Sequence, residues 1–433
     1  MNQSAKNSDP RHTVLVLGYG AREHCLAWKI AQSPKVGRLF IAPGNAGTAK
    51  IGTNVPLHEE STEEIVAFAL DNKIDLTVVG PNFPLAFGVV DAFQASGLRI
   101  FGPTRAAARL ESSKIFAKAF MQRHSIPTAE YRAFTDYEQA VAYLDEMSTP
   151  RVVVKISGLG RRGRGVSVCD TRAEALAALR SYLIDGAFGE SGSTVIIEER
   201  LQGPELSLFA LADGRTVVPL LAVRDYKRLG NGDCGPNTGG MGAFGPPVDF
   251  DSRMMKDVVS NVLQRTVDGM AREGNPFVGI LYAGLMLTDS GLRVLEFNAR
   301  FGNPEALVVL PLLESDFYEA IEACIDGRLT PGHVRMSSQS AATVVLASSG
   351  YPESHEVGRA ILGVEAAESL PGVLVFHHGT ASDEDSLVTT RGRILAVTAT
   401  GDTLSRALKS AYGGIAAIQF DGMYYRTDIG SGQ

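Results

Sequence analysis

The sequence of 433 residues contains few cysteines, a single tryptophan and no long apolar run. Its four cysteines are scattered without the spacing of a metal site or a disulfide framework, which favours a reduced, cytoplasmic protein. No apolar run approaches the roughly 18 residues of a membrane span. Residues 1–11 are polar and lack the apolar core of a signal peptide, so we expect a disordered leader there.

The overall charge and composition are those of an ordinary globular protein. The formal net charge is −7 and 45% of the residues are hydrophobic, so a large core can be buried. Neither nucleic acid nor a membrane is an expected partner, because the charge is negative and apolar spans are lacking. The length predicts about three domains. The sequence leaves a monomer and a homodimer equally open.

Strands and helices alternate along the first part of the chain. Apolar strand patterns at 13–17, 38–41 and 75–79 are separated by helical patterns. This alternation is typical of a doubly wound parallel sheet. We therefore expect an N-terminal α/β domain over residues 12–105.

The pattern changes after residue 105. Mixed helical and strand patterns predict an α+β unit over 106–330, with a glycine-rich flap subdomain at about 125–195. Residues 331–433 are predicted to form a small, mostly β domain. Its expected elements are strands at 341–347, 374–377 and 393–398 and a helix at 404–412.

Glu296 and Asn298 lie two residues apart at the end of a predicted buried strand, so their side chains point to the same face. A carboxylate and an amide oxygen suit Mg²⁺ (or Mn²⁺), which takes one or two protein ligands besides substrate phosphates. Arg300 follows, with a guanidinium that can clamp a phosphate or a carboxylate. The alternative is a strand that ends in a polar turn.

A glycine-rich turn containing Gly18 and Gly20 links a predicted strand to a predicted helix, and Arg22 and Glu23 follow it. Glycines there let the backbone approach a phosphate, and N–H groups at a helix start favour anions. Glu23 occupies the third glycine position of the dinucleotide-binding motif, which argues against a nicotinamide cofactor. An anion site for a phosphorylated substrate is the better supported interpretation.

A second glycine-rich segment follows Lys155 and includes Gly163, Arg164 and Gly165. A lysine at a strand end before a loop rich in glycine and arginine suits a flexible cationic flap over polyphosphate. The Walker A pattern is absent. A glycine-rich hairpin with a solvated basic tip is the alternative.

Two further segments carry weaker signals. Glu198 and Leu201 leave another predicted strand before Glu205, an arrangement that can offer main-chain groups to adenine and a carboxylate to ribose. Surface glutamates are the alternative account. The segment 232–243 is rich in glycine, and each glycine costs about 0.5–1 kcal/mol where a helix or strand is required, so we expect a lid without regular structure.

Five segments carry a family resemblance: 42–48, 235–243, 281–286, 296–305 and 421–426. The run Gly-Pro-Asn-Thr-Gly-Gly-Met-Gly at 235–242 is a strong signal in this company. Together the segments resemble the ATP-grasp ligases, and among them the phosphoribosylamine–glycine ligase family of purine biosynthesis. The resemblance extends over about 14–430, which is nearly the whole chain.

The resemblance implies an N-terminal α/β domain, an ATP-grasp domain over 106–330 and a small C-terminal domain. It also implies an ADP-forming ligation through an acyl phosphate, with ATP and Mg²⁺ as cofactors and a small amino acid and a phosphoribosylamine-like amine as substrates. Lys114 and Lys155 would hold the ATP phosphates, with Gly163, Arg164 and Gly165 covering them.

The remaining implied roles also follow the family pattern. Glu198 and Leu201 would contact adenine, Glu205 would contact ribose, and Glu296 and Asn298 would bind Mg²⁺. Arg300, Lys155 and Asn303 would act in catalysis. The substrates would contact Gly18, Gly20, Arg22, Glu23, Asn82, Asp225, Lys227, Asn237, Thr238, Gly239 and, as a second phosphate anchor, Arg393.

Several positions depart from the family pattern. Ser157 stands where Asp is usual, Arg164 where Lys is usual, Asn82 where Glu is usual, Asn303 where Asp is usual and Tyr226 where His is usual. Two alternatives therefore stay open. One is a paralogous ligase that joins another carboxylate to another amine in specialised metabolism, and the other is a non-catalytic nucleotide-binding regulator.

Overall fold

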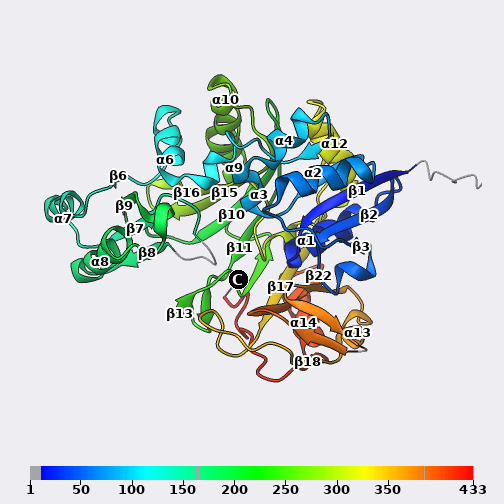
Figure 1. The fold of residues 1–433 in the computed structure, drawn as a ribbon. Coiled ribbons are helices and arrows are strands. Elements are labelled where there is room, and N and C mark those ends of the chain that lie inside the picture. The colour runs from blue at the N-terminus through cyan, green and yellow to red at the C-terminus, as the bar shows by residue number, and fades with distance from the viewer. Residues whose placement is uncertain (1–10, 161–164, 385, 433) are drawn as a thin grey trace, which may run out of the picture.

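The computed structural model describes residues 11–160, 165–384 and 386–432 (Figure 1). All of the expected leader except Arg11 lies outside the described residues, and so do Gly163 and Arg164 of the expected flap. Among the residues that the structure describes, no helix is both long and apolar enough to cross a membrane.

The N-terminal unit is a parallel five-stranded sheet in the order β3-β2-β1-β4-β5. Val14 and Val16 of the central strand pack toward α1, while Leu15 and Leu17 pack toward α2 and α4 on the other face. Because both faces are covered, the strand is apolar throughout, and the predicted doubly wound parallel sheet is confirmed. The elements are β1 (His12–Gly18), α1 (Ala21–Ile30), β2 (Val36–Pro43), β3 (Thr53–Asn54), α2 (Thr62–Asp71), β4 (Leu76–Val79), α3 (Asn82–Phe87), α4 (Val89–Ala95) and β5 (Ile100–Phe101).

A four-stranded antiparallel sheet, β6-β9-β7-β8, forms the flap subdomain at the left of Figure 1. Its strands pack on α7 and α8 around a small apolar core of their own, which includes Val152, Val154 and Ile197. The short helices α5 (Arg109–Ser112) and α6 (Lys114–Arg123) lead into it. Its elements are β6 (Tyr131–Phe134), α7 (Tyr137–Glu146), β7 (Val152–Ile156), β8 (Val166–Cys169), α8 (Arg172–Leu179) and β9 (Val195–Glu199).

The largest sheet has eight strands in the order β16-β15-β10-β11-β14-β17-β22-β19, with neighbours antiparallel. Its first five strands come from the predicted second unit and its last three from the predicted C-terminal unit, so one sheet runs through both. The strands are β10 (Glu205–Asp213), β11 (Val217–Asp225), β14 (Gly242–Gly245), β15 (Val278–Thr288), β16 (Gly291–Asn298), β17 (Ser340–Ala347), β19 (Val373–His377) and β22 (Arg393–Gly401). Helices α9 (Ser252–Val258), α10 (Gln264–Arg272), α11 (Ala306–Val309) and α12 (Phe317–Ile325) belong to the second unit.

The C-terminal unit carries the three strands and the helix that were predicted, with helix α14 (Leu404–Ile415) against β17 and β22. A small sheet of β18 (Ala360–Ile361), β21 (Ser386–Thr389) and β20 (Thr380–Asp383) and helix α13 (Val364–Glu368) complete it.

The expectation that the glycine-rich segment lacks regular structure was wrong. It forms a hairpin of β12 (Arg228–Gly230) and β13 (Cys234–Asn237) and continues into β14. The hairpin is held from outside, because Asn231 and Thr427 exchange hydrogen bonds of 2.7 and 3.0 Å and Gly232 N–H donates to Asp428 at 2.8 Å. The C-terminal segment thus offsets the cost of ordering the glycines.

Candidate active site

The predicted metal pair lies on β16, whose register against β15 shifts between Gly284 and Leu285. Glu296 and Asn298 lie opposite Gly284 and Tyr282. Burial alone would raise the pKa of Glu296, but Lys114, Lys227 and Lys155 outweigh it and hold that pKa below its usual value. The described residues contain no cluster of three or more His, Cys, Asp or Glu side chains that could hold a metal. An ionised carboxylate with a neighbouring amide oxygen fits a cation that takes few protein ligands.

Lys155, at the end of β7, is buried beside Glu198 of β9. Its Nζ lies 2.9 Å from Oε2 of Glu198, and Lys118 Nζ lies 3.2 Å from Oε1 of the same carboxylate. Burial lowers the pKa of Lys118 to about 8. Burial would also lower the pKa of Lys155, but Glu198 and Glu296 outweigh it and raise that pKa. The Glu198 side chain therefore holds two ammonium groups, while its main chain lies in the sheet between β6 and β7.

Lys114 begins helix α6, and Ser113 caps that helix through a hydrogen bond from Phe116 N–H at 3.3 Å. The Lys114 N–H donates to Ser157 O at 2.8 Å, and its Nζ donates to Gly158 O at 3.5 Å. Burial lowers the pKa of Lys114, while Glu296 opposes that shift. Lys114 therefore joins the start of α6 to the segment after β7, through both its backbone N–H and its ammonium group.

Arg300 follows β16, and its guanidinium is held by two side chains and one backbone carbonyl. Its Nη2 donates to Glu111 at 2.7 Å and to Asn298 Oδ1 at 3.1 Å, and its Nη1 donates to Phe301 O at 3.0 Å. Asn82 Nδ2 donates to the same Glu111 oxygen at 3.0 Å. Asn82 and the predicted catalytic arginine are thus linked by Glu111, which was not predicted as a site residue.

The turn at Gly18 is filled in part by a side chain of the protein. Glu23 Oε2 accepts the Gly20 N–H at 2.8 Å, and Arg22 Nε donates to Glu23 Oε1 at 2.6 Å. A Cβ at Gly18, where φ is +120°, would lie 2.2 Å from Glu23 Cγ, and one at Gly80 would lie 2.5 Å from that atom. These glycines make room for a glutamate of the protein, and the Gly20 N–H expected to meet an anion is already bonded to it.

Asn303 lies beside the same turn. Its Nδ2 is 3.6 Å from where a Cβ on Gly20 would stand, and its Oδ1 is buried without a hydrogen-bond partner among the described residues. A buried acceptor of this kind is costly unless a ligand satisfies it. Asn303 is therefore placed to receive a hydrogen bond from a bound molecule.

Arg393, the expected phosphate anchor, contacts the protein itself through one guanidinium nitrogen. Its Nη1 donates to Gly240 O at 3.2 Å, to Asn303 O at 2.9 Å and to Gly239 O. The guanidinium joins the lid to the loop after β16. Of the other predicted lid residues, Thr238 N–H donates to Lys227 O at 2.7 Å, and Asn237 ends β13.

Glu205 and Lys227, predicted for ribose and substrate, form an ion pair of 2.6 Å on a half-exposed surface. Asp225 ends β11 nearby; burial, aided by Glu305 and Glu205 against Lys227, raises its pKa. Glu305 is itself buried and accepts a hydrogen bond of 3.0 Å from the Tyr282 hydroxyl. Lys227 is therefore the cation among three neighbouring acidic side chains at this end of the sheet.

Tyr226, which departs from the family pattern, contacts the C-terminal segment. Its hydroxyl accepts the Gly430 N–H at 2.8 Å, and the Arg426 guanidinium lies 4.7 Å from its ring centroid. Tyr226 therefore helps to attach the lid to the C-terminal segment.

Two other predicted site residues lie in connections of the flap subdomain. Leu201 follows β9 in the connection to β10, and Gly165, with φ of +99°, precedes β8.

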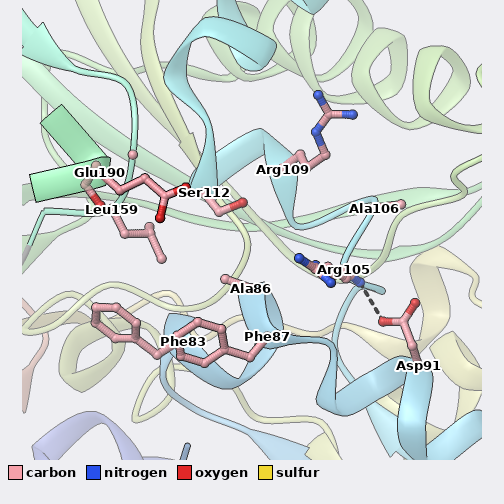
Figure 2. A pocket seen from close by; sticks show the side chains of 12 residues that line it. Phe83, Ala86, Phe87, Asp91, Arg105, Ala106, Arg109, Ser112, Leu159 and Glu190 are labelled. Atoms are coloured by element: carbon pink, nitrogen blue, oxygen red, sulfur yellow. Dashed lines mark hydrogen bonds between the residues drawn. The ribbon is translucent and has the colours of Figure 1, made fainter. Parts of the chain in front are cut away.

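A cavity of about 680 Å³ opens between the N-terminal unit and the flap subdomain (Figure 2). Leu159 and Glu190 face Phe83 and Phe87 of α3 across it. Asn82 and Glu111 directly precede two of its lining residues, Phe83 and Ser112. The cavity is therefore adjacent to the Asn82–Glu111–Arg300 contacts.

Four residues of the site were not predicted as site residues from the sequence: Lys118, Glu111, Tyr282 and Glu305. Lys118 lies four residues after Lys114, which places both on one helix face, so this spacing could have found it. Glu305 stands in the segment 296–305 without a pattern of its own. A lone glutamate such as Glu111 carries no signal of its own in the sequence.

Three family models match the chain. They describe phosphoribosylglycinamide synthetase, with its N domain at residues 12–111, its ATP-grasp (A) domain at 112–306 and its C domain at 341–432. The phosphoribosylamine–glycine ligase of Halalkalibacterium halodurans is 47% identical over 418 residues, which are 96% of each chain. The trifunctional purine biosynthetic protein adenosine-3 of Gallus gallus is 48% identical over 96% of this chain, which spans about 42% of that relative's length.

Solved structures agree with this assignment. The crystal structure of phosphoribosylamine–glycine ligase from Thermotoga maritima has a TM-score of 0.84 and 35% identity, covering 96% of this chain and all of that one. The biotin carboxylase domain of a 2-oxoglutarate carboxylase from Hydrogenobacter thermophilus, with a TM-score of 0.74 and 17% identity, shares the fold alone. The chain belongs to the phosphoribosylglycinamide synthetase family.

Proposed function

We propose that this protein ligates glycine to 5-phosphoribosylamine with ATP, giving glycinamide ribonucleotide, ADP and phosphate. The observation that carries the proposal is the grouping of Glu296, Asn298 and Arg300 with the buried ammonium groups of Lys114 and Lys155. Full-length relatives named for this reaction support the choice of substrates. We keep the division at residues 12–105, 106–330 and 331–433 and a cytoplasmic location as parts of the same proposal.

The residues present fit a bound Mg²⁺, because the low pKa of Glu296 keeps its carboxylate ionised beside the amide oxygen of Asn298. When bound, the ion neutralises phosphate charge as it develops. Lys114 and Lys155 bind the phosphates, and the backbone after Glu198 meets adenine. Because the reaction is mainly positioning and charge neutralisation, these groups matter more than a nucleophilic side chain.

The reaction proceeds in two steps at this site. The glycine carboxylate attacks the γ-phosphate and forms an acyl phosphate with release of ADP, while Arg300 steadies the transferring group. The amine of phosphoribosylamine then displaces phosphate to form the amide. The unpartnered Oδ1 of Asn303 accepts a hydrogen bond from this amine, and Arg22 beside the turn at Gly18 attracts the 5′-phosphate.

The testing experiment is a coupled assay of ADP release with Mg-ATP, glycine and freshly generated phosphoribosylamine, with the product mass measured in parallel. We expect ADP release that depends on both substrates, together with the mass of glycinamide ribonucleotide. ATP turnover with other carboxylates or amines and without this product would replace the proposal with a paralogous ligase. Lack of ATP turnover with every candidate would favour a regulatory protein.

A further inference from the structure

Glu111 lies on the short helix α5, three residues before Lys114, and is 8% exposed. A buried carboxylate is costly unless charged or hydrogen-bonding groups surround it. Here three donors do so. Asn82 Nδ2 and Arg300 Nη2 donate to Oε1 at 3.0 and 2.7 Å, and the Ala299 N–H donates to Oε2 at 2.8 Å.

The donors come from distant parts of the fold. Asn82 begins α3 of the N-terminal sheet unit, while Ala299 and Arg300 directly follow the metal strand β16. One carboxylate therefore joins the N-terminal unit to the loop that carries Arg300. Glu111 directly precedes Ser112, which lines the cavity of Figure 2 between the N-terminal unit and the flap subdomain.

The contacts leave Arg300 with a defined set of unused donors. A guanidinium has five N–H groups in a fixed plane. Glu111, Asn298 Oδ1 and Phe301 O take three of them, while the Nε–H is buried without a hydrogen-bond partner among the described residues. The plane is fixed by Glu111 on one side, and the Nε–H and one N–H of Nη1 are the two donors that these acceptors leave for an anion.

We propose that Glu111 is a positioning residue, which acts through Arg300 by fixing the plane of its guanidinium and its contact with Asn298. Asn82 completes this arrangement, because its amide can donate to Glu111 where a carboxylate could not. The inference rests on the proposed function, in which Arg300 steadies the transferring group.

A double-mutant cycle tests whether Glu111 acts through Arg300. We expect Glu111→Ala to lower kcat by about 10–100-fold, the range typical of residues that orient a functional ligand, with KM for ATP changed much less. In an Arg300→Lys background the same substitution should cost no more than about 3-fold, because the group it orients is already lost. Losses that multiply, or a Glu111→Ala kcat within about 2-fold of wild type, would overturn the proposal.

A second variant and a matched control complete the cycle. If Glu111→Ala does not fold, Glu111→Gln takes its place, since its amide nitrogen cannot accept and either the Ala299 N–H or both Asn82 and Arg300 must lose their partner. Glu64→Gln, at an exposed position of α2, should leave kcat unchanged.

A crystal structure of the same Glu111 variant separates this inference from the proposed function. We expect the Arg300 guanidinium to leave Asn298 Oδ1, and an unmoved guanidinium would refute the positioning role. Failure of the proposed function instead appears in the wild-type protein, as absence of glycinamide ribonucleotide. The position of Arg300 can be determined in either case.

Discussion

The ammonium group of Lys155 and the carboxylate of Glu198 form a buried ion pair of 2.9 Å, and Lys118 holds the other oxygen of that carboxylate at 3.2 Å. The pKa values of the two lysines are shifted in opposite directions. The pKa of Lys118 is lowered to about 8 by burial, whereas that of Lys155 is raised because Glu198 and Glu296 outweigh its burial. Alkaline pH therefore removes one partner of Glu198 and spares the other.

This difference predicts the pH dependence of ATP binding. As pH rises through about 8, Lys118 loses its proton, and Lys155 becomes the one charged partner of the two lysines that hold Glu198. Glu198 then neutralises more of the Lys155 charge, so the attraction of Lys155 for a phosphate weakens. We expect KM for ATP to rise between pH 7 and 9.5, by several-fold. Lys118→Arg, which stays charged, should move the rise to higher pH. Lys256→Arg, at an exposed position, is the control, and identical profiles for both variants would disprove the link.

The metal pair predicts a large loss of activity. Glu296→Ala removes one of two proposed protein ligands and leaves Lys114 and Lys155 without their shared carboxylate. We expect kcat to fall by at least about 100-fold, as for removal of a group that stabilises developing charge. Glu64→Ala serves as the exposed control in the same ADP-release assay. Near-normal turnover of the Glu296 variant would refute the metal site.

Asn82→Glu predicts a pH-dependent loss of stability. The new carboxylate would face Glu111, within the reach of the present 3.0 Å hydrogen bond. Repulsion raises the folded-state pKa of one of them above its unfolded value, so stability relative to wild type is lost as pH rises through that raised pKa. We expect urea unfolding to reveal a loss of about 1–3 kcal/mol at pH 8 and a smaller one at pH 5.

Asn82→Gln is the neutral control for that measurement, because it matches the length of glutamate and keeps an amide donor. Its stability relative to wild type should be the same at pH 5 and pH 8. If the glutamate variant is likewise insensitive to pH, the two side chains do not face each other.

Buried histidines at the contact between the N-terminal and C-terminal units predict acid sensitivity. His377 N–H donates to His24 Nδ1 at 2.9 Å, and His377 Nδ1 lies 2.9 Å from Thr380 Oγ1. Burial lowers the pKa of His377 from 6.5 to about 4. The unfolded chain therefore binds the proton first as pH falls, and stability is lost between pH 6.5 and 4.

The shift for His377 corresponds to about 3 kcal/mol across that window. We expect His377→Asn, whose amide can still bond Thr380, to lose that much less stability than wild type between pH 7 and 4. Urea unfolding at several pH values measures the slope. Equal slopes for the two proteins would assign acid sensitivity to other groups.

Much of the fold could be predicted from local patterns. The apolar run at Val14–Leu17 requires cover on both faces, and the strand spacing gives the parallel sheet. Glu296 and Asn298 share a face because side chains on a strand alternate. Such arguments work where a residue's surroundings are set by its neighbours in the sequence.

Other features depend on contacts that no local pattern encodes. The hairpin at 228–237 forms because Asn231 and Gly232 meet the C-terminal segment almost two hundred residues away. One nitrogen of the Arg393 guanidinium holds backbone carbonyls of the lid and of the loop after β16, a contact that no local pattern predicts. The role of Glu111 likewise exists only once three distant donors converge on it.

The long sheet has a consequence for dividing the protein. Strand β14 pairs with β17, so the hydrogen bonds between them join the two units that the sequence separates at residue 330. A cut there, if the pieces separate, would uncover the unpaired N–H and C=O groups along this ladder on both strands, which invite association with other chains. The two pieces should therefore aggregate when each is produced alone and stay in solution when they are produced together. The pairing of β14 with β17 thus decides whether a split protein can be reassembled.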